Sequence, residues 1–167
     1  MQRRVTVGCM ISVCMLYHVI SLWCSIFVAF TKGKKGSMSR KKILCIEDNK
    51  TNMLLVSRIV GAEGHELLQA VDGPSAIELL QHESPDIILL DINIPGISGL
   101  DLAKMIKADE RLRPIPLLAT TANVLVGDRE RCIEAGCDDY LPKPLDIRRL
   151  RHMLRVYLEQ GEQAAAT

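Results

Sequence analysis

Three carboxylates stand at the ends of short apolar runs. Glu47 and Asp48 directly follow the run 43–46, and Asp91 ends the run 86–91. Carboxylates held within a few ångströms of one another repel, and a divalent cation that prefers oxygen ligands, such as Mg²⁺, offsets this repulsion. The sequence therefore predicts a metal site if the fold brings the three acids together.

A hydroxyl and a cation stand at the ends of two further runs. Thr121 ends the run 116–121, and Lys143 closely follows 139–141. Phosphoryl transfer needs a carboxylate nucleophile, a metal ion and fixed donors for the charge on the phosphoryl oxygens. We expect Asp91 to be the nucleophile, because it follows a run apolar enough for a strand buried on both faces.

The elements that would position these residues alternate regularly. Strands are predicted at 43–46, 67–71, 86–91, 116–121 and 139–141, and each is followed by a helical pattern that ends at or before a glycine, a proline or the tail. This alternation predicts an α/β fold with a doubly wound five-stranded parallel sheet, in the flavodoxin-like order 2-1-3-4-5, with helices on both faces. The switch point of that order lies between the first and third strands, where the three acids would meet.

The composition is that of one globular domain. The chain has 167 residues, of which 48% are apolar and 25% charged. All 20 acidic residues follow Met38 while five of the 21 Lys and Arg precede it, so the part from Met38 onward carries a net charge of −4 and is a poor candidate for nucleic-acid binding. The six cysteines form no C-x-x-C pair, and we expect them to be reduced and structural in a cytosolic setting.

The segment 1–37 has two interpretations. Residues 5–30 are 26 residues without a charge, long enough for a membrane anchor, and the heavier basic flank after them would place the rest in the cytoplasm. Alternatively, Met38 is the true start, and 1–37 is upstream translation from a misassigned start. The predicted organisation is therefore 1–37, a folded domain at 38–160 and a disordered tail at 161–167. The predicted location is the cytoplasm, with tethering to the inner membrane if 5–30 is a real anchor.

Four motifs resemble, in order, the signatures of the response-regulator receiver family, which is CheY-like. They are CIEDN at 45–49, LLDINIPGISG at 89–99, ATTA at 119–122 and YLPKP at 140–144. The resemblance covers about 41–158 and looks most like the stand-alone, single-domain receivers of the DivK sort. Because the matches are widely separated and all lie at strand ends, the resemblance is specific.

The resemblance implies a role for each site residue. Asp91 would receive a phosphoryl group from a sensor histidine kinase or a histidine phosphotransfer protein. Asp48 and Asp91 would bind Mg²⁺ or Mn²⁺ through their carboxylates, Asn93 through its backbone carbonyl, and Glu47 directly or through water.

The resemblance also implies a switch. Lys143 would pair with one phosphoryl oxygen and Thr121 would donate to another, drawing in the loop after the fourth strand as Tyr140 turns inward. Lys143–Pro144 resembles the family's cis peptide. The face formed by the helix at 128–135, the strand at 139–141 and the helix at 145–159 would bind a downstream protein partner.

The predicted function is that of a phosphorelay response regulator in a two-component system. Only 23 residues follow Pro144, too few for an output domain, so we expect output through a partner and no enzymatic activity beyond phosphoryl acceptance and autodephosphorylation. Two alternatives remain open. One is a membrane-tethered receiver or docking module; the other is an aspartyl-phosphate phosphatase, which would need a second acid where Asn93 stands.

Overall fold

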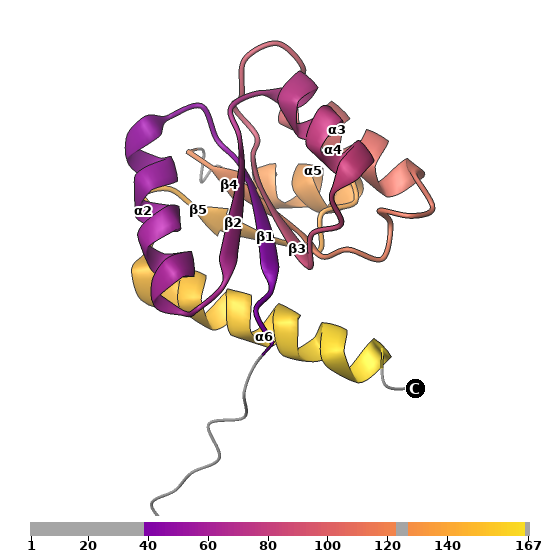
Figure 1. The fold of residues 1–167 in the computed structure, drawn as a ribbon. Helices are drawn as coiled ribbons and strands as arrows, with labels where there is room; N and C mark the ends of the chain where they lie inside the picture. Colours follow the sequence, from indigo (N-terminus) through magenta and orange to yellow (C-terminus); the bar gives the residue numbers. More distant parts are fainter. Residues whose placement is uncertain (1–38, 123–126, 166–167) are drawn as a thin grey trace, which may run out of the picture. The chain divides into compact units, whose positions relative to one another are not determined.

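In the part of the chain that the structure describes, five parallel strands form the centre of the folded unit (Figure 1). The computed structural model describes residues 39–122 and 127–165, and its compact unit begins at Arg40. The strands are β1 (Lys42–Ile46), β2 (Glu66–Ala70), β3 (Ile87–Asp91), β4 (Leu117–Thr121) and β5 (Asp139–Pro142). Their order is β2-β1-β3-β4-β5. The predicted fold class and strand order are confirmed.

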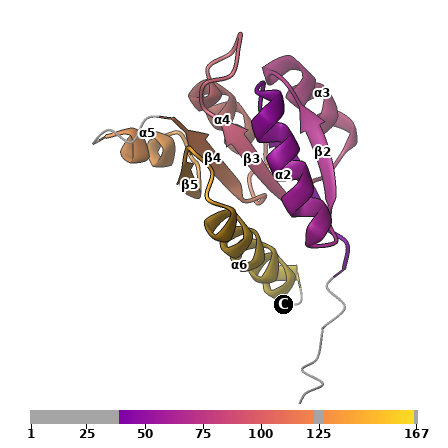
Figure 2. The same cartoon turned by 90° about the vertical axis from the view of Figure 1, so that its left-hand side faces the viewer.

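Among the described residues, five helices cover the two faces of the sheet (Figures 1 and 2). They are α2 (Lys50–Ala62), α3 (Gly73–His82), α4 (Gly99–Ala108), α5 (Asp128–Glu134) and α6 (Ile147–Ala165). Buried residues of α2 and α6 pack with one side of the strands, and those of α3, α4 and α5 pack with the other. The central strands β3 and β4 are buried at every position, as expected for a parallel sheet covered on both faces.

Polar side chains fix the starts of two helices close to the site. The Asn49 side chain accepts hydrogen bonds from the backbone N–H groups of Thr51 and Asn52 and caps α2. Asp72 and Ser75 form a capping box at the start of α3. Both caps anchor helices that directly follow strand ends, and thereby define the loops around the carboxyl edge of the sheet.

The spacing of Ser98 and Asp101 is typical of a capping box, but the structure forms none at the start of α4. Ser98 occupies the N-cap position, but its side chain caps no backbone group. Instead the Gly99 N–H donates to the Ile92 carbonyl at 3.2 Å, and Asp101 lies 3.7 Å from Lys104. Close backbone packing at Gly99 therefore replaces the side-chain cap.

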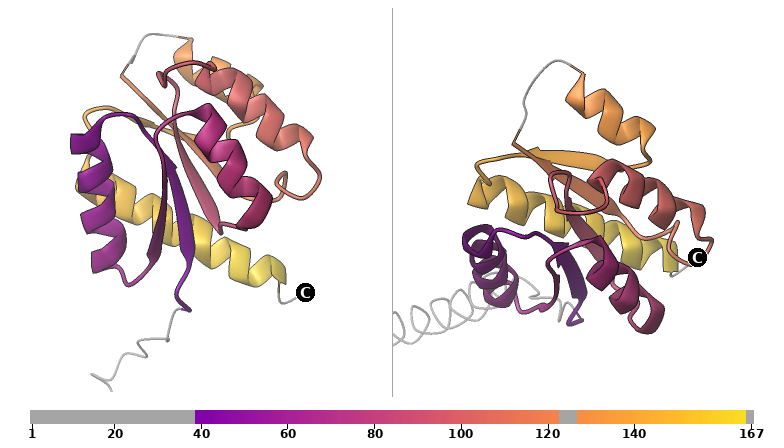
Figure 3. Two further views of the ribbon diagram at one scale, coloured as in Figure 1. Left: turned by 45° about the horizontal axis from the view of Figure 1, so that its top comes forward. Right: turned by 90° about the horizontal axis from the view of Figure 1, so that it is seen from above.

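The last helix is longer than predicted. The structure continues α6 to Ala165, beyond the predicted end at Glu159, so the predicted tail at 161–167 begins too early. Gly161 is followed by Glu, Gln and Ala, which are strong helix formers, and one glycine costs a helix only about 1 kcal/mol. Figure 3 shows α2 and α6 side by side, and Arg155 of α6 donates to Glu63 at the end of α2.

The described cysteines are structural. Cys45, Cys132 and Cys137 are buried free thiols, and burial raises the pKa of Cys45 and of Cys137 to about 12. Thiols with so high a pKa are neutral and unreactive at physiological pH.

Within residues 39–122 and 127–165, no helix is long and apolar enough to cross a membrane. The predicted anchor at 5–30 lies outside the described residues.

Candidate functional site

The sequence-predicted side chains come from four strand ends at one edge of the sheet. Glu47 directly follows β1, Asp91 ends β3, Thr121 ends β4 and Lys143 directly follows β5. The strands are parallel and adjacent, so their carboxyl ends meet at this edge. The backbone N–H of Lys143 donates to the Thr121 carbonyl at 2.7 Å, which fixes the loop after β5 beside β4.

The three carboxylates form one cluster. Oxygens of Glu47, Asp48 and Asp91 all lie within 4.8 Å of one another. Glu47 and Asp91 are each 3% exposed, whereas Asp48 is open to solvent. Two buried acids and one accessible acid provide hard oxygen ligands with an open side, and this donor set fits a divalent cation that retains some of its water.

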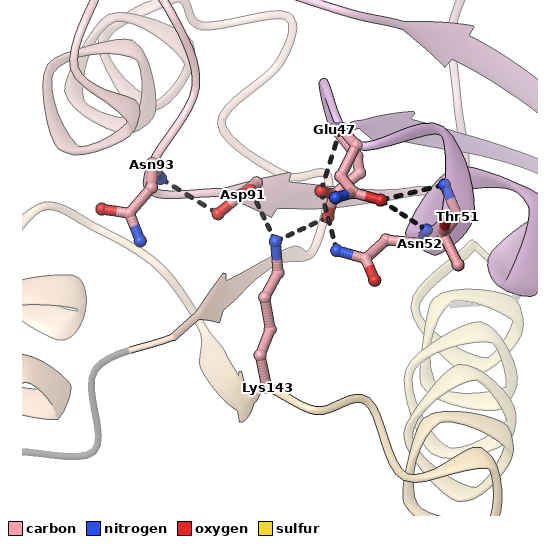
Figure 4. A network of polar contacts seen from close by, with 7 residues as sticks. Glu47, Thr51, Asn52, Asp91, Asn93 and Lys143 are labelled. Carbon is pink, nitrogen blue, oxygen red and sulfur yellow. Dashed lines mark hydrogen bonds and ion pairs between the residues drawn. The ribbon is translucent and has the colours of Figure 1, made fainter.

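Lys143 connects the two buried acids (Figure 4). Its Nζ lies 2.5 Å from Asp91 Oδ2 and 2.8 Å from Glu47 Oε2. Burial lowers the pKa of the Lys143 ammonium, but the hydrogen bonds to Asp91 and Glu47 outweigh burial and raise it above its usual value. The lysine is therefore charged at neutral pH, and its single charge faces a cluster of three carboxylates.

The other oxygen of Asp91 is held by the loop that follows it. Asn93 donates its backbone N–H to Asp91 Oδ1 at 3.0 Å. The loop returns tightly to β3, because a Cβ on Gly99 would lie 2.5 Å from Ile92 Cα. Only glycine fits there, so the loop that aims Asp91 depends on Gly99.

Thr121 lies beside the site and is 3% exposed. It lines a cavity of about 150 Å³ together with Asn93, Asp128 and Cys132, whereas its neighbour Thr120 does not line this cavity. Thr121 thus lies beside the space between the loop after β3 and the start of α5.

Tyr140 is half-buried on β5, and two arginines contact its ring. The guanidinium carbons of Arg129 and Arg149 are 6.0 and 5.6 Å from the centre of its ring. Arg149 also donates to the Tyr140 carbonyl at 3.3 Å. These are cation–π contacts of the ordinary kind, and they join α5, β5 and α6 on one face.

The predicted cis peptide between Lys143 and Pro144 is present.

Two contributions to this region were missed by the sequence reasoning. The side-chain amide of Asn52, which no motif singled out, donates to Glu47 Oε1 at 3.0 Å. Arg149 is exposed on the last helix, and it also contacts the Tyr140 ring. A polar amide one turn into the helix that follows an acidic strand end was the available signal for Asn52.

The fold and this edge of the sheet define a class of signalling domain. A family model of the response regulator receiver domain matches residues 43–155. The chain belongs to this family and is a receiver domain of a response regulator.

Similarity to individual response regulators indicates which kind of receiver the chain resembles. The chain is 39% identical over 118 residues to the polar-differentiation response regulator DivK of Brucella ovis, a match that covers 71% of this chain and 96% of the relative. The corresponding protein of Brucella anthropi is 38% identical over the same length and with the same coverage. The chain is thus a DivK-like receiver.

Solved structures agree with the fold. The receiver domain of sensor histidine kinase PA1611 from Pseudomonas aeruginosa, whose active-site cleft holds a magnesium ion, is 33% identical with a TM-score of 0.67. The match covers 72% of this chain and 99% of that one. The Mn²⁺-bound response regulator Rcp1 is 30% identical with a TM-score of 0.59, over 68% of this chain and 88% of that one.

Proposed function

We propose that Asp91 is the phosphoacceptor of this receiver. The observation that carries the proposal is its position: a buried carboxylate at the end of the central strand β3, with one oxygen on Lys143 and the other on the Asn93 N–H. An Asp91 oxygen attacks the phosphorus of a phosphohistidine, a new P–O bond forms, and the P–N bond to the imidazole breaks. The phosphohistidine belongs to a sensor histidine kinase or a histidine phosphotransfer protein.

The same cluster would hold Mg²⁺ or Mn²⁺. Glu47, Asp48 and Asp91 would supply carboxylate oxygens, and Asn93 its backbone carbonyl. The carboxylate excess over Lys143 and the solvent access at Asp48 support this assignment. The ion, when bound, neutralises charge on the phosphoryl oxygens. The metal ions in the PA1611 receiver and in Rcp1 also support it.

Lys143 and Thr121 would contact the phosphoryl oxygens from two sides. Lys143 already holds an Asp91 oxygen with its charged ammonium, so the same group can shift to an oxygen on the phosphorus. Thr121 would donate a hydrogen bond from its hydroxyl to another phosphoryl oxygen. This contact would draw in the loop after β4 as Tyr140 turns inward. The change would appear on the face formed by α5, β5 and α6, which is the proposed surface for a downstream protein partner.

The resulting protein is a signalling switch, with output through that partner. Its chemistry is confined to accepting a phosphoryl group and losing it again by autodephosphorylation. Its net negative charge after Met38 makes nucleic acid a poor partner. We place it in the cytoplasm, attached to the inner membrane only if residues 5–30 act as an anchor.

Labelling with a small phosphodonor tests the assignment. The full chain is incubated with Mg²⁺ and radiolabelled acetyl phosphate, and the base-labile label is counted. We expect the wild type and the control variant Asp139→Asn to take up label, and Asp91→Asn to take up none. Equal labelling of Asp91→Asn would overturn the assignment.

A further inference from the structure

Asn52 is the only described side chain besides Lys143 that donates to the Glu47 carboxylate within residues 39–122 and 127–165. Its Nδ2 lies 3.0 Å from Glu47 Oε1, and the backbone N–H of Asn49 lies 3.3 Å from the same oxygen. Lys143 binds the other oxygen, Oε2, at 2.8 Å. Figure 4 shows Glu47 held between Asn52 on one side and Lys143 on the other.

The two donors affect the charge of the cluster differently. The Lys143 ammonium cancels one negative charge, whereas the Asn52 amide is neutral and leaves the charge of Glu47 available to a cation. A second cation in place of Asn52 would compete with a bound metal, and an acid would repel Glu47. A neutral donor is the group that fixes the carboxylate without lowering its attraction for a metal ion.

Glu47 needs such a restraint more than its neighbour does. Its side chain has one more rotatable bond than that of an aspartate, and it is 3% exposed, so little water can hold the oxygen that Lys143 does not bind. Asp48 is solvent-exposed and can turn towards a cation. Without Asn52, Glu47 Oε1 would keep only the longer contact to the Asn49 backbone.

The helix itself does not require asparagine at this position. Asn52 lies in the first turn of α2, where its backbone N–H is already capped by Asn49. Alanine is a better helix former than asparagine, so the amide has a cost to the helix that its contact with Glu47 offsets.

We propose that Asn52 is a positioning residue of the metal site: it fixes the orientation of the Glu47 carboxylate and thereby sets the affinity for Mg²⁺ or Mn²⁺. This inference rests on the metal site of the proposed function. Groups that hold a metal-ligating side chain commonly change metal affinity about 10- to 100-fold when removed.

Direct titration with Mn²⁺ tests the role without any phosphorylation. The electron paramagnetic resonance signal of free Mn²⁺ falls as the ion binds, so titrating the full chain gives a dissociation constant. We expect Asn52→Ala to weaken Mn²⁺ binding by about 10-fold or more. The control Thr51→Ala changes an exposed neighbour whose hydrogen bond to Asn49 is made by its backbone N–H, and should bind as the wild type does. Unchanged or tighter binding by Asn52→Ala would overturn the proposal.

A double-mutant cycle shows whether Asn52 acts through Glu47. In a Glu47→Ala background, we expect Asn52→Ala to change Mn²⁺ affinity less than twofold, because the group it positions is gone. A tenfold or greater loss of Mn²⁺ affinity on adding Asn52→Ala to the Glu47→Ala variant would contradict the proposal. Thermal unfolding followed by circular dichroism verifies that Asn52→Ala folds, as its higher helix propensity predicts.

Phosphorylation supplies a separate readout. Labelling of Asn52→Ala by acetyl phosphate should require a higher Mg²⁺ concentration, in proportion to its weaker binding of the ion. Higher Mg²⁺ should restore the label, and a defect that Mg²⁺ does not restore would contradict a role in metal affinity.

The two proposals can fail separately. If wild type takes up label but Asn52→Ala binds Mn²⁺ normally, only the role of Asn52 is lost. If the wild type binds Mn²⁺ but takes up no label, only the phosphoacceptor assignment is lost.

Discussion

Two lysines of this receiver are equally shielded yet bind their partners in different ways. The side chains of Lys107 and Lys143 are 16% and 15% exposed. Lys107 Nζ donates to the carbonyls of Arg113 and Ile115 and to the Asp138 carboxylate, so its three donors meet two neutral groups and one charge. Lys143 contacts two carboxylates, with a third close by.

The difference separates a structural contact from a functional site. Around Lys107 each donor has a partner and the single positive charge meets a single negative charge. The charges there balance, so a bound cation would not stabilise this region. Around Lys143 negative charge is in excess, and the site gains stability from any ligand that supplies positive charge. Burial alone does not distinguish the two lysines; the balance of charge does.

Adding Mg²⁺ should produce the largest difference between the two regions. A ligand that binds only the folded state at 100 times its dissociation constant raises the free energy of unfolding by about 2.7 kcal/mol. Urea titrations with and without Mg²⁺ should show this gain for the wild type and for Asp138→Ala, but not for Asp48→Asn. A full gain in Asp48→Asn would place the metal elsewhere.

Removing the Lys107 partner should destabilise the fold by about 2 kcal/mol. Asp138 Oδ2 also accepts the backbone N–H of Leu117 at 2.7 Å, and Leu117 is fully buried, so Asp138→Ala leaves that N–H without its acceptor. Urea denaturation measures the loss. The control Asp101→Ala removes an exposed pair with Lys104 and should cost about 0.5 kcal/mol or less. Equal losses of unfolding free energy in Asp138→Ala and Asp101→Ala would contradict a structural role for Asp138.

Neutralising one acid beside Lys143 should instead raise the free energy of unfolding. In metal-free buffer, Asp91→Asn relieves repulsion within the cluster while Glu47 still pairs with the lysine, so we expect the free energy of unfolding to rise by about 1 kcal/mol. Chemical denaturation in the presence of a chelator gives the value. A clear loss of stability would mean that Asp91 serves the fold as Asp138 does.

The smallest effect should be seen in the titration of Lys143. Its pKa is raised in the folded state, so its ion pairs contribute fully below the unfolded value of 10.5 and are lost only as the pH rises through the folded value. Asp91→Asn removes one of the contacts that raise this pKa, and the pKa should fall. NMR of the lysine side-chain carbons across the alkaline range measures it. A pKa that is the same in both proteins would contradict the contact with Asp91.

The sequence predicted the sheet order and the strand-end residues because both follow from local patterns. Apolar runs of strand length mark β1, β3 and β4, and alternation with helices dictates parallel pairing. The acids, the threonine and the lysine then meet at one edge as a consequence of topology. Their roles were predicted by resemblance to the family and still await the experiments above.

What the sequence could not supply depends on three-dimensional packing. Asn52 looks like any polar residue at the start of a helix until α2 brings it against Glu47. Ser98 stands where a serine cap is expected, but the close approach of Gly99 to the Ile92 backbone shapes the start of α4 instead. The end of α6 was predicted too early, because the helix continues through Gly161 to Ala165.

Mapping the phosphorylated residue tests the central claim most directly. The full chain is treated with acetyl phosphate and Mg²⁺, the acyl phosphate is trapped by borohydride reduction, and the modified residue is identified by peptide mass spectrometry. We predict modification at Asp91, dependent on Mg²⁺ and absent without phosphodonor. Modification at Glu47 or Asp48 in place of Asp91, or none at any carboxylate, would contradict the account.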